Sequence, residues 1–420
     1  MRNNLNISII GLGYVGLPLA LKLSEYFNVI GFDKKKQRVK ELRFNFDKNK
    51  EVSKNDLKKS KIVYSNNIND LKYSNVFIVT VPTPVTKSNQ PDFKPLLDAC
   101  KNIGKIITKG TTVIFESTVY PGVTEEICAR YINKYSKLIP SKDFHLGYSP
   151  ERMNPGDKVH TVHKIAKVIS ADNKKTVSLL KKIYKKVTTG KIFVAKNIKT
   201  AEAAKVIENT QRDINVAFMN EITKLFKKIN LNIFDVLDVA ETKWNFLKFR
   251  PGLVGGHCIG VDPYYLSFLA KTKKVDTKLI LASRKINNNF SNFIAQFINN
   301  FFKNRKSFLI LGLTFKENVN DLRNTKIIDL IKALKKFGHK IDVNDILAYN
   351  DEAKKIGIKL TSLNQTKIYD SIILTVPHDD YKKLKQSFFK KKLRKGGMVF
   401  DLKGIWRNKK FPKNIKYISI

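Results

Sequence analysis

Cysteine is scarce in this 420-residue chain, which has only Cys100, Cys128 and Cys258 and no Cys-x-x-Cys motif. A sparse, odd number argues against a disulfide framework, and the absence of His/Cys pairs at zinc-ligand spacing predicts no metal site. No apolar run approaches the roughly 20 residues that a membrane span needs. The apolar stretch at residues 7–10 is too short for a signal peptide. We therefore expect a cytoplasmic protein with no membrane partner.

Acidic residues are also scarce: the chain has 36 Asp and Glu but 79 Lys and Arg, which gives a net charge of +43. Taken alone, this charge predicts binding to nucleic acid or to another anionic surface. The lysines, however, are spread along the whole chain, and the densest clusters, residues 34–36 and 390–395, are short. This even distribution favours a general compositional bias toward lysine over a dedicated basic binding surface. We therefore expect no nucleic-acid partner, and we keep a basic nucleic-acid-binding protein as an alternative.

The order of apolar segments predicts an α/β protein of two or three domains, since the chain is too long for one core. Up to about residue 195, short apolar strands alternate with helical stretches, as in a parallel sheet. The expected strands are residues 6–10, 29–33, 76–80, 112–117 and 144–148. Residues 200–231 have apolar positions at helical spacing without glycine or proline, which indicates one long helix. A second α/β segment, a weak echo of the first, has expected strands at residues 307–311, 371–376 and 398–402.

A glycine-rich turn follows the first expected strand. Gly11, Gly13 and Gly16 form a Gly-x-Gly-x-x-Gly pattern that includes Tyr14 and Val15, and a helix is expected to begin there. In this context the first glycine makes the turn, the second lets the backbone approach a pyrophosphate, and the third lets helix and strand pack. The helix N-terminus then presents N–H groups to the phosphates. The pattern predicts a dinucleotide site.

Asp33 lies about 20 residues beyond this turn, at the end of the next expected strand. Its carboxylate is placed to accept the ribose hydroxyls and to repel a 2′-phosphate, so we expect NAD rather than NADP. Arg38 and the lysines at 34–36 lie nearby and weaken that repulsion.

Residues 255–260 read Gly-Gly-His-Cys-Ile-Gly. Glycines on both sides of Cys258 let the backbone approach a ligand and leave the thiol uncrowded, so we interpret Cys258 as a nucleophile. Cys100 and Cys128 lie in apolar segments and are expected to be structural, and His257 is expected to be structural as well.

Three polar residues complement the cysteine. Asp262, four residues beyond Cys258, is close enough to handle a water molecule. Lys205 and Asn209 lie at i and i+4 on the expected long helix and therefore share one face. A cation and an amide together can stabilise an oxyanion and lower the pKa of a thiol.

This combination resembles the UDP-glucose/GDP-mannose dehydrogenase family over essentially the whole chain. Seven segments carry the resemblance in the same order: residues 11–18, 81–84, 116–119, 149–152, 205–209, 255–262, and 312–316 with Asp321 and Arg323. The resemblance implies two Rossmann-like parallel-sheet domains joined by a long central helix, and a homodimer formed through that helix. Residues 1–199 would bind NAD, residues 200–300 would dimerise and contribute to the active site, and residues 301–420 would bind the UDP-sugar.

The resemblance also implies a cofactor site. NAD would be bound by Gly11, Gly13, Tyr14, Val15, Gly16, Asp33 and Arg38, with Thr83 and Thr118 lining its pocket and Arg323 reaching its phosphates.

For the reaction, the resemblance implies that Cys258 is the nucleophile and that Lys205 and Asn209 stabilise the oxyanion. Water would be positioned or activated by Glu151, Asp262 and Thr118. The sugar substrate would be contacted by Glu151, Arg152, Lys205, Asn209, Gly255, Lys316 and, from the neighbouring subunit, Arg250.

Residues 149–156 resemble the branch of the family that acts on N-acetylated or mannose-type sugars. Three further segments, residues 211–213, 242–246 and 249–256, are most similar to UDP-N-acetylglucosamine and UDP-N-acetylgalactosamine 6-dehydrogenases of surface-polysaccharide pathways. They imply oxidation of a C6 alcohol to the uronic acid by two NAD molecules, through a thiohemiacetal and a thioester on Cys258. UDP-glucose, GDP-mannose and UDP-N-acetylmannosamine stay open as alternative substrates. A two-electron hydroxyacid dehydrogenase would not need Cys258.

Overall fold

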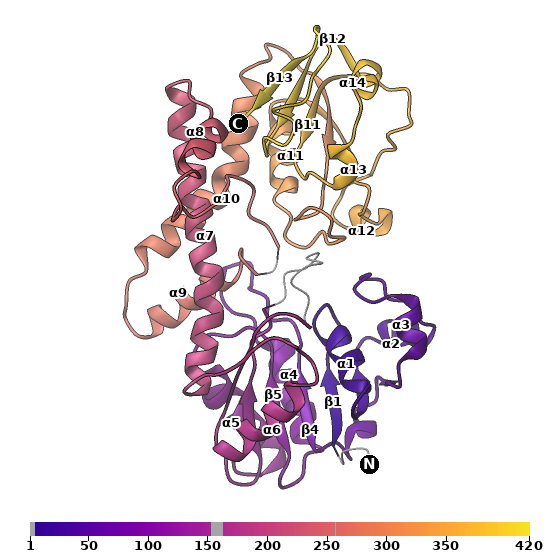
Figure 1. Cartoon of the computed structure of the whole chain (residues 1–420), viewed down its shortest axis with the longest axis vertical. Coiled ribbons are helices and arrows are strands. Elements are labelled where there is room, and N and C mark those ends of the chain that lie inside the picture. Colours follow the sequence, from indigo (N-terminus) through magenta and orange to yellow (C-terminus); the bar gives the residue numbers. More distant parts are fainter. Residues whose placement is uncertain (1–4, 153–162, 257) are drawn as a thin grey trace. The chain divides into compact units, whose positions relative to one another are not determined.

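The computed structural model describes residues 5–152, 163–256 and 258–420 and has an α/β architecture (Figure 1). Two compact units are present, Met1–Glu208 with Tyr264–Asp276, and Asn209–Pro263 with Thr277–Ile420. Helix α7 (Ile198–Lys228) passes through the boundary in sequence and is the predicted long helix. No helix within the described ranges is long and apolar enough to cross a membrane. The predictions for His257 and for residues 153–156 lie outside the described residues.

The first unit contains a sheet whose described strands have the order β3-β2-β1-β4-β5-β6-β7-β8. Neighbouring strands are parallel, except that β6 and β7 are antiparallel. Strand β7 therefore begins near the edge of the sheet where β6 ends. The strands are β1 (Asn6–Ile10), β2 (Asn28–Phe32), β3 (Val63–Ser65), β4 (Val76–Val79), β5 (Thr112–Phe115), β6 (His145–Tyr148), β7 (Lys167–Ala171) and β8 (Ile192–Val194).

Apolar side chains on both faces of this sheet are covered by helices. In β1, Ile7 and Ile9 pack in one core cluster with α1 (Gly16–Ser24) and α6 (Lys174–Tyr184). Ile10 points to the other face and packs with α4 (Lys94–Gly104) and α5 (Ala129–Ser136). The unit also has α2 (Lys36–Arg43), α3 (Lys54–Lys59), η1 (Ile68–Leu71) and η2 (Val123–Cys128), and most of α9 (Asp262–Thr272).

The second unit has a parallel sheet with the described order β10-β9-β11-β12-β13. Phe308 and Ile310 pack on one face with α10 and α11, and Leu309 and Leu311 pack on the other face with Trp406. The strands are β9 (Ser307–Leu311), β10 (Lys340–Asn344), β11 (Tyr369–Leu374), β12 (Leu393–Asp401) and β13 (Lys416–Ser419). The helices are α8 (Ile233–Ala240), α10 (Lys278–Asn299), α11 (Ile327–Lys336), α12 (Asn350–Lys355), α13 (Asp379–Lys382) and α14 (Gln386–Lys392).

Strands β1 and β9 have the predicted bounds, and the other predicted strands differ at one or both ends. Strands β3, β7, β8, β10 and β13 were not predicted. Strands β3 and β8 have three residues each, too few for a periodic signal. Strands β7, β10 and β13 begin with lysine, which interrupts the apolar pattern that sequence analysis follows.

Candidate active site

The loop between β1 and α1 has the geometry of a nucleotide-binding turn. Gly11 has a φ of +99°, which favours glycine, and its N–H donates to the Phe32 carbonyl at 2.8 Å. A Cβ at Gly16 would lie 1.9 Å from the Gly11 carbonyl oxygen, so only glycine allows α1 to begin there. A Cβ at Gly13 would meet nothing within 4 Å. The backbone at Gly13 is therefore open to a ligand.

Asp33 is hydrogen-bonded to the same loop. Its Oδ2 accepts the N–H of Leu12 at 3.0 Å, and its Oδ1 accepts the N–H of Lys35 at 2.9 Å. A carboxylate offers about four acceptor positions, so acceptor capacity remains for ribose hydroxyls. The open backbone at Gly13 and this carboxylate together fit the adenosine diphosphate half of NAD.

Arg38 supports the glycine loop from the protein side. Its Nε donates to the Leu12 carbonyl at 2.8 Å, and a terminal nitrogen donates to Asp47 Oδ1 at 2.8 Å. The side chain is only 10% exposed. The structure therefore gives Arg38 a role in shaping the loop, and its direct contact with the cofactor stays a prediction.

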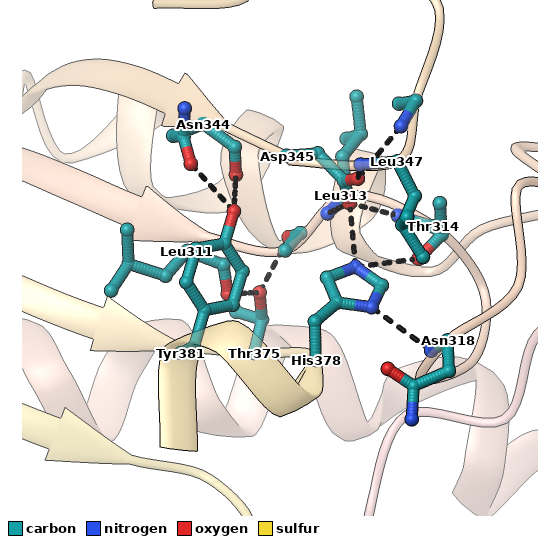
Figure 2. Close-up of polar contacts among 12 residues, drawn as sticks. Leu311, Leu313, Thr314, Asn318, Asn344, Asp345, Leu347, Thr375, His378 and Tyr381 are labelled. Carbon is teal, nitrogen blue, oxygen red and sulfur yellow. Dashed lines mark hydrogen bonds and ion pairs between the residues drawn. The ribbon is translucent and has the colours of Figure 1, made fainter. Parts of the chain in front are cut away.

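The second unit repeats the turn after β9 (Figure 2). Gly312 has a φ of +101°, and the Leu313 N–H donates to Asp345 Oδ2 at 2.6 Å. The Thr375 hydroxyl donates to the carbonyls of Leu311 and Gly312. In the first unit, the Thr80 hydroxyl donates in the same way to the carbonyls of Ile10 and Gly11. The weak echo noted in the sequence is thus a repeated hydrogen-bond pattern.

The repeat differs at the acidic residue, because His378 covers Asp345. The His378 Nδ1 accepts the N–H of Asn318 at 3.0 Å, so the proton lies on Nε2, which is 3.1 Å from Asp345 Oδ2. Both side chains are fully buried. Burial raises the pKa of Asp345, but its interactions with His378 and with two backbone N–H groups outweigh burial and lower the pKa to about 2. Asp345 is therefore a structural carboxylate, unlike Asp33.

Two threonines predicted to line the cofactor pocket lie together in the first unit. The Thr83 hydroxyl donates to the Thr118 carbonyl at 2.7 Å. The fully buried Tyr265 donates its hydroxyl to the Thr83 carbonyl at 2.9 Å. These bonds join the loops after β4 and β5 at the carboxyl edge of the sheet, where open α/β sheets bind ligands.

A buried charged cluster lies at the same edge. Glu116 follows β5, Glu151 follows β6 and Lys167 begins β7. The Lys167 Nζ lies 3.1 Å from Glu116 Oε2 and 2.9 Å from Glu151 Oε2. The Tyr184 hydroxyl donates to Glu116 Oε1 at 2.5 Å. Glu151 was predicted as a site residue and Lys167 was not, although a lysine inside the apolar run 166–171 is a usable signal.

The loop that carries Cys258 packs on the loop after β9 within the second unit. A Cβ at Gly256, whose φ is +82°, would lie 2.8 Å from the Phe315 ring. A Cβ at Gly255 would lie 2.7 Å from the Asn324 carbonyl oxygen. These glycines are therefore required by contacts inside the protein, whereas the sequence had suggested the approach of a ligand. The Cys258 side chain is partly exposed, and the cysteines, all described, form no disulfide.

Three predicted catalytic residues are linked by hydrogen bonds in the second unit. The N–H of Asp262, at the start of α9, donates to the Cys258 carbonyl at 2.9 Å. The Asn209 amide donates to Asp262 Oδ2 at 2.5 Å, and both side chains are buried. Lys205 is also buried and lies one turn before Asn209 on α7.

The predicted ligand-binding arginines pair with carboxylates of their own unit. The pairs are Arg152 with Glu208 at 2.9 Å, Arg250 with Asp238 at 3.1 Å and Glu241 at 2.9 Å, and Arg323 with Asp321 at 2.6 Å. Lys316 is half-buried, and its carbonyl accepts the Thr314 hydroxyl at 3.0 Å. The roles of these residues toward substrate or cofactor stay predictions.

Comparison with known proteins agrees with this architecture. Residues 5–188, 199–289 and 309–408 match the NAD binding, central and UDP binding domains of the UDP-glucose/GDP-mannose dehydrogenase family. The chain is 48% identical to protein CapL of Staphylococcus aureus over 96% of both chains. It is 43% identical to UDP-N-acetyl-D-glucosamine 6-dehydrogenase of Pseudomonas aeruginosa over 95% of this chain and 97% of the relative. The solved UDP-D-ManNAc dehydrogenase of Pyrococcus horikoshii has a TM-score of 0.87 over 99% of both chains at 28% identity.

The family matches cover most of both sheets and of α7, and the glycine loop with Asp33 fits the cofactor of the first matched domain. The chain therefore belongs to the UDP-glucose/GDP-mannose dehydrogenase family and is an NAD-dependent nucleotide-sugar 6-dehydrogenase.

Proposed function

We propose that this enzyme oxidises the C6 alcohol of UDP-N-acetylglucosamine or UDP-N-acetylgalactosamine to the uronic acid through a thiohemiacetal and a thioester on Cys258. The observation that carries this mechanism is the hydrogen-bonded series Asn209, Asp262 and Cys258. It joins an amide donor and a carboxylate to the backbone of the nucleophile. When bound, NAD supplies the hydride acceptor for both oxidations.

The Cys258 thiolate attacks the aldehyde carbon, so the aldehyde is not released. Helix α9 begins at Asp262, four residues after Cys258, and the partial positive charge of its N-terminus favours the thiolate. One N–H of the Asn209 amide donates to Asp262, which leaves the other for the substrate oxyanion. The ammonium of Lys205 adds charge stabilisation to the same intermediate.

Hydrolysis of the thioester completes the reaction. A water oxygen attacks the acyl carbon, the C–S bond breaks, and the thiolate of Cys258 leaves. We propose that Glu151 accepts the proton of this water, and that Asp262 and Thr118 help to orient it. Glu151 suits this role because Lys167 and the N–H of Arg152 hold its carboxylate while 11% of its side chain is exposed.

The substrate class is supported by the name of the Pseudomonas aeruginosa relative, whose sequence matches nearly the whole chain. UDP-N-acetylmannosamine is the second candidate, because the Pyrococcus horikoshii structure superposes over nearly the whole chain. Incubation with NAD and a panel of UDP- and GDP-sugars, followed by NADH absorbance, tests the proposal. We expect UDP-N-acetylglucosamine or UDP-N-acetylgalactosamine to give two NADH per sugar and the fastest turnover. Faster turnover of UDP-N-acetylmannosamine, UDP-glucose or GDP-mannose would contradict the substrate assignment.

We also propose that the chain has three functional segments: residues 1–199 bind NAD, residues 200–300 form the homodimer interface, and residues 301–420 bind the UDP-sugar. The support is an apolar stripe on α7: Ile207, Phe218 and Leu225 are 54%, 55% and 53% exposed. Their spacings of 11 and 7 residues place them on one helix face. Such a face is typical of an interaction surface. Sedimentation equilibrium should show a dimer that Phe218→Asp weakens, and a monomeric wild type would contradict the proposal.

The resemblance of residues 211–213, 242–246 and 249–256 supports a proposal for the pathway. We propose a cytoplasmic enzyme whose uronic acid product enters a surface polysaccharide. Deletion of its gene should remove the corresponding uronic acid from that polysaccharide, as measured by sugar analysis of the purified polymer.

A further inference from the structure

Lys167 is a fully buried cation at the ligand-binding edge of the first sheet. It reaches this edge because β7 is antiparallel to β6, so the first residue of β7 lies near the last residues of β6. Its ammonium contacts both Glu116 and Glu151. Burial of a lysine is unfavourable unless the charge is paired, and here two carboxylates share one ammonium.

The side chains of the cluster differ in solvent exposure, from fully buried in the core to partly exposed at the surface. Glu116 and Lys167 have no exposed side-chain area, and Glu116 is also bound by the buried Tyr184. Glu151 is the outer member, with 11% of its side chain exposed. Its Oε2 accepts Lys167, and its Oε1 accepts the N–H of Arg152 at 2.8 Å. Lys167 and the N–H of Arg152 therefore hold the Glu151 carboxylate in one orientation.

We infer that Lys167 is a positioning residue for the hydrolytic step, which holds Glu151 ionised and in one orientation for its proposed role as the base, and that Glu116 tunes this effect by sharing the ammonium. This inference rests on the proposed function. Burial lowers the pKa of Lys167, but Glu116 and Glu151 together raise it above its usual range, so the lysine remains charged. The charge of Lys167 stabilises the carboxylate form of Glu151, whereas the charge of Glu116 opposes it.

The opposing charges predict opposite effects of two substitutions. Lys167→Met leaves an unbranched side chain that is one atom shorter and removes the cation, so the titration of Glu151 should move upward by about one pH unit or more. Glu116→Gln removes the competing carboxylate, so the titration of Glu151 should move downward. Lys167→Arg should keep the wild-type titration, because it restores the charge. Carboxyl 13C NMR of glutamate-labelled protein, with Glu151→Gln to assign the signal, measures these shifts without requiring activity.

Kinetics then separate positioning from general structural support. In single turnovers, Lys167→Met should leave the first NADH-forming step within about threefold of wild type. It should slow thioester hydrolysis about tenfold or more and accumulate the Cys258 adduct in denaturing mass spectrometry. The acidic limb of the hydrolysis rate should move to higher pH. Lys199→Met is the matched control, because it breaks the exposed pair of Lys199 with Glu126, and it should leave both steps unchanged.

The inference would be overturned if the titration of Glu151 did not move in either Lys167→Met or Glu116→Gln. It would also be overturned if Lys167→Met slowed hydride transfer and thioester hydrolysis equally. If Lys167→Met does not fold, the direction in which the Glu151 titration moves in Glu116→Gln decides whether the inference holds. A wild type that forms no Cys258 adduct would refute the proposed thioester mechanism instead, and the NMR shifts would still show whether Lys167 controls Glu151.

Discussion

Asn209 and Asp262 are joined by a buried hydrogen bond of 2.5 Å, from the amide nitrogen to the carboxylate, although 53 residues separate them in sequence. The bond connects α7 to the first residue of α9, whose N–H binds the Cys258 carbonyl. A residue assigned to oxyanion stabilisation and one assigned to water handling therefore share a hydrogen bond and depend on each other for orientation.

Asp262→Asn tests this relationship. The asparagine can still accept the Asn209 amide, but the negative charge is lost. We expect NAD affinity to be retained and the rate of acid formation to fall by roughly 100-fold or more, the range typical of a lost acid–base group. Steady-state kinetics and NAD titration measure both effects. Asp329→Asn, in a half-buried pair with Lys326, is the control, and wild-type turnover by Asp262→Asn would contradict the assignment.

Cys258→Ser separates the thioester mechanism from a simple alcohol dehydrogenase. Formation of the acid should fall by about 1,000-fold or more, since loss of a nucleophile typically costs several orders of magnitude. Denaturing mass spectrometry of the wild type should find the substrate adduct only on Cys258. Cys100→Ala and Cys128→Ala should retain turnover, because both thiols are buried in the core and burial raises the pKa of Cys128 well above its usual range. Two NADH per sugar from Cys258→Ser at near wild-type rate would refute the mechanism.

Gly13 and Gly16 should respond differently to alanine. In Gly16→Ala the new methyl would lie 1.9 Å from the Gly11 carbonyl oxygen, so the free energy of unfolding should fall by about 1–3 kcal/mol or more. In Gly13→Ala the methyl meets no protein atom within 4 Å, so stability should change by less than about 0.5 kcal/mol. The same methyl should raise the Kd for NAD about tenfold or more, because it occupies the space at the Gly13 backbone that the pyrophosphate would fill. Urea unfolding and NAD titration of the two variants provide the test. Equal stability of both variants would show that the loop does not need its third glycine.

Asp33 should determine the choice between NAD and NADP. Repulsion between its carboxylate and a 2′-phosphate should favour NAD by at least about 100-fold in kcat/KM, since juxtaposed like charges cost several kcal/mol. Asp33→Ser should reduce that preference to about tenfold or less. Comparable efficiency of the wild type with both cofactors would show that the lysines at 34–36 and Arg38 override the carboxylate.

Asp345 should make stability depend on pH in the acid range. Its pKa is about 2 in the folded protein against an ordinary value of 3.8. A lowered pKa means that the stabilisation is complete above about pH 4 and is lost as pH falls toward 2, with a full size of about 2 kcal/mol. The difference in unfolding free energy between wild type and Asp345→Asn should therefore be constant from about pH 7 to 5 and should shrink below about pH 4. Urea titrations across this range measure it, and a pH-independent difference would contradict the role of the ionised carboxylate.

Local sequence patterns predicted the elements whose residues signal their own conformation. Strand β1, the glycine turn and α7 were found because apolar spacing and glycine placement are local properties of the chain. Strand β7 was missed because its first residue is a buried lysine, whose environment depends on residues 51 and 16 positions away in sequence.

Residue types in a fixed order were enough to identify the family, the NAD fingerprint and the residues proposed for catalysis. The partners of those residues, in contrast, depend on how the chain folds. Gly255 and Gly256 are required by Asn324 and Phe315, and Asp345 is covered by His378. Lys167 reaches Glu151 because β7 is antiparallel to β6. Such contacts join residues that are distant along the chain, and they exist only after the sheets have formed and brought the ends of the strands together.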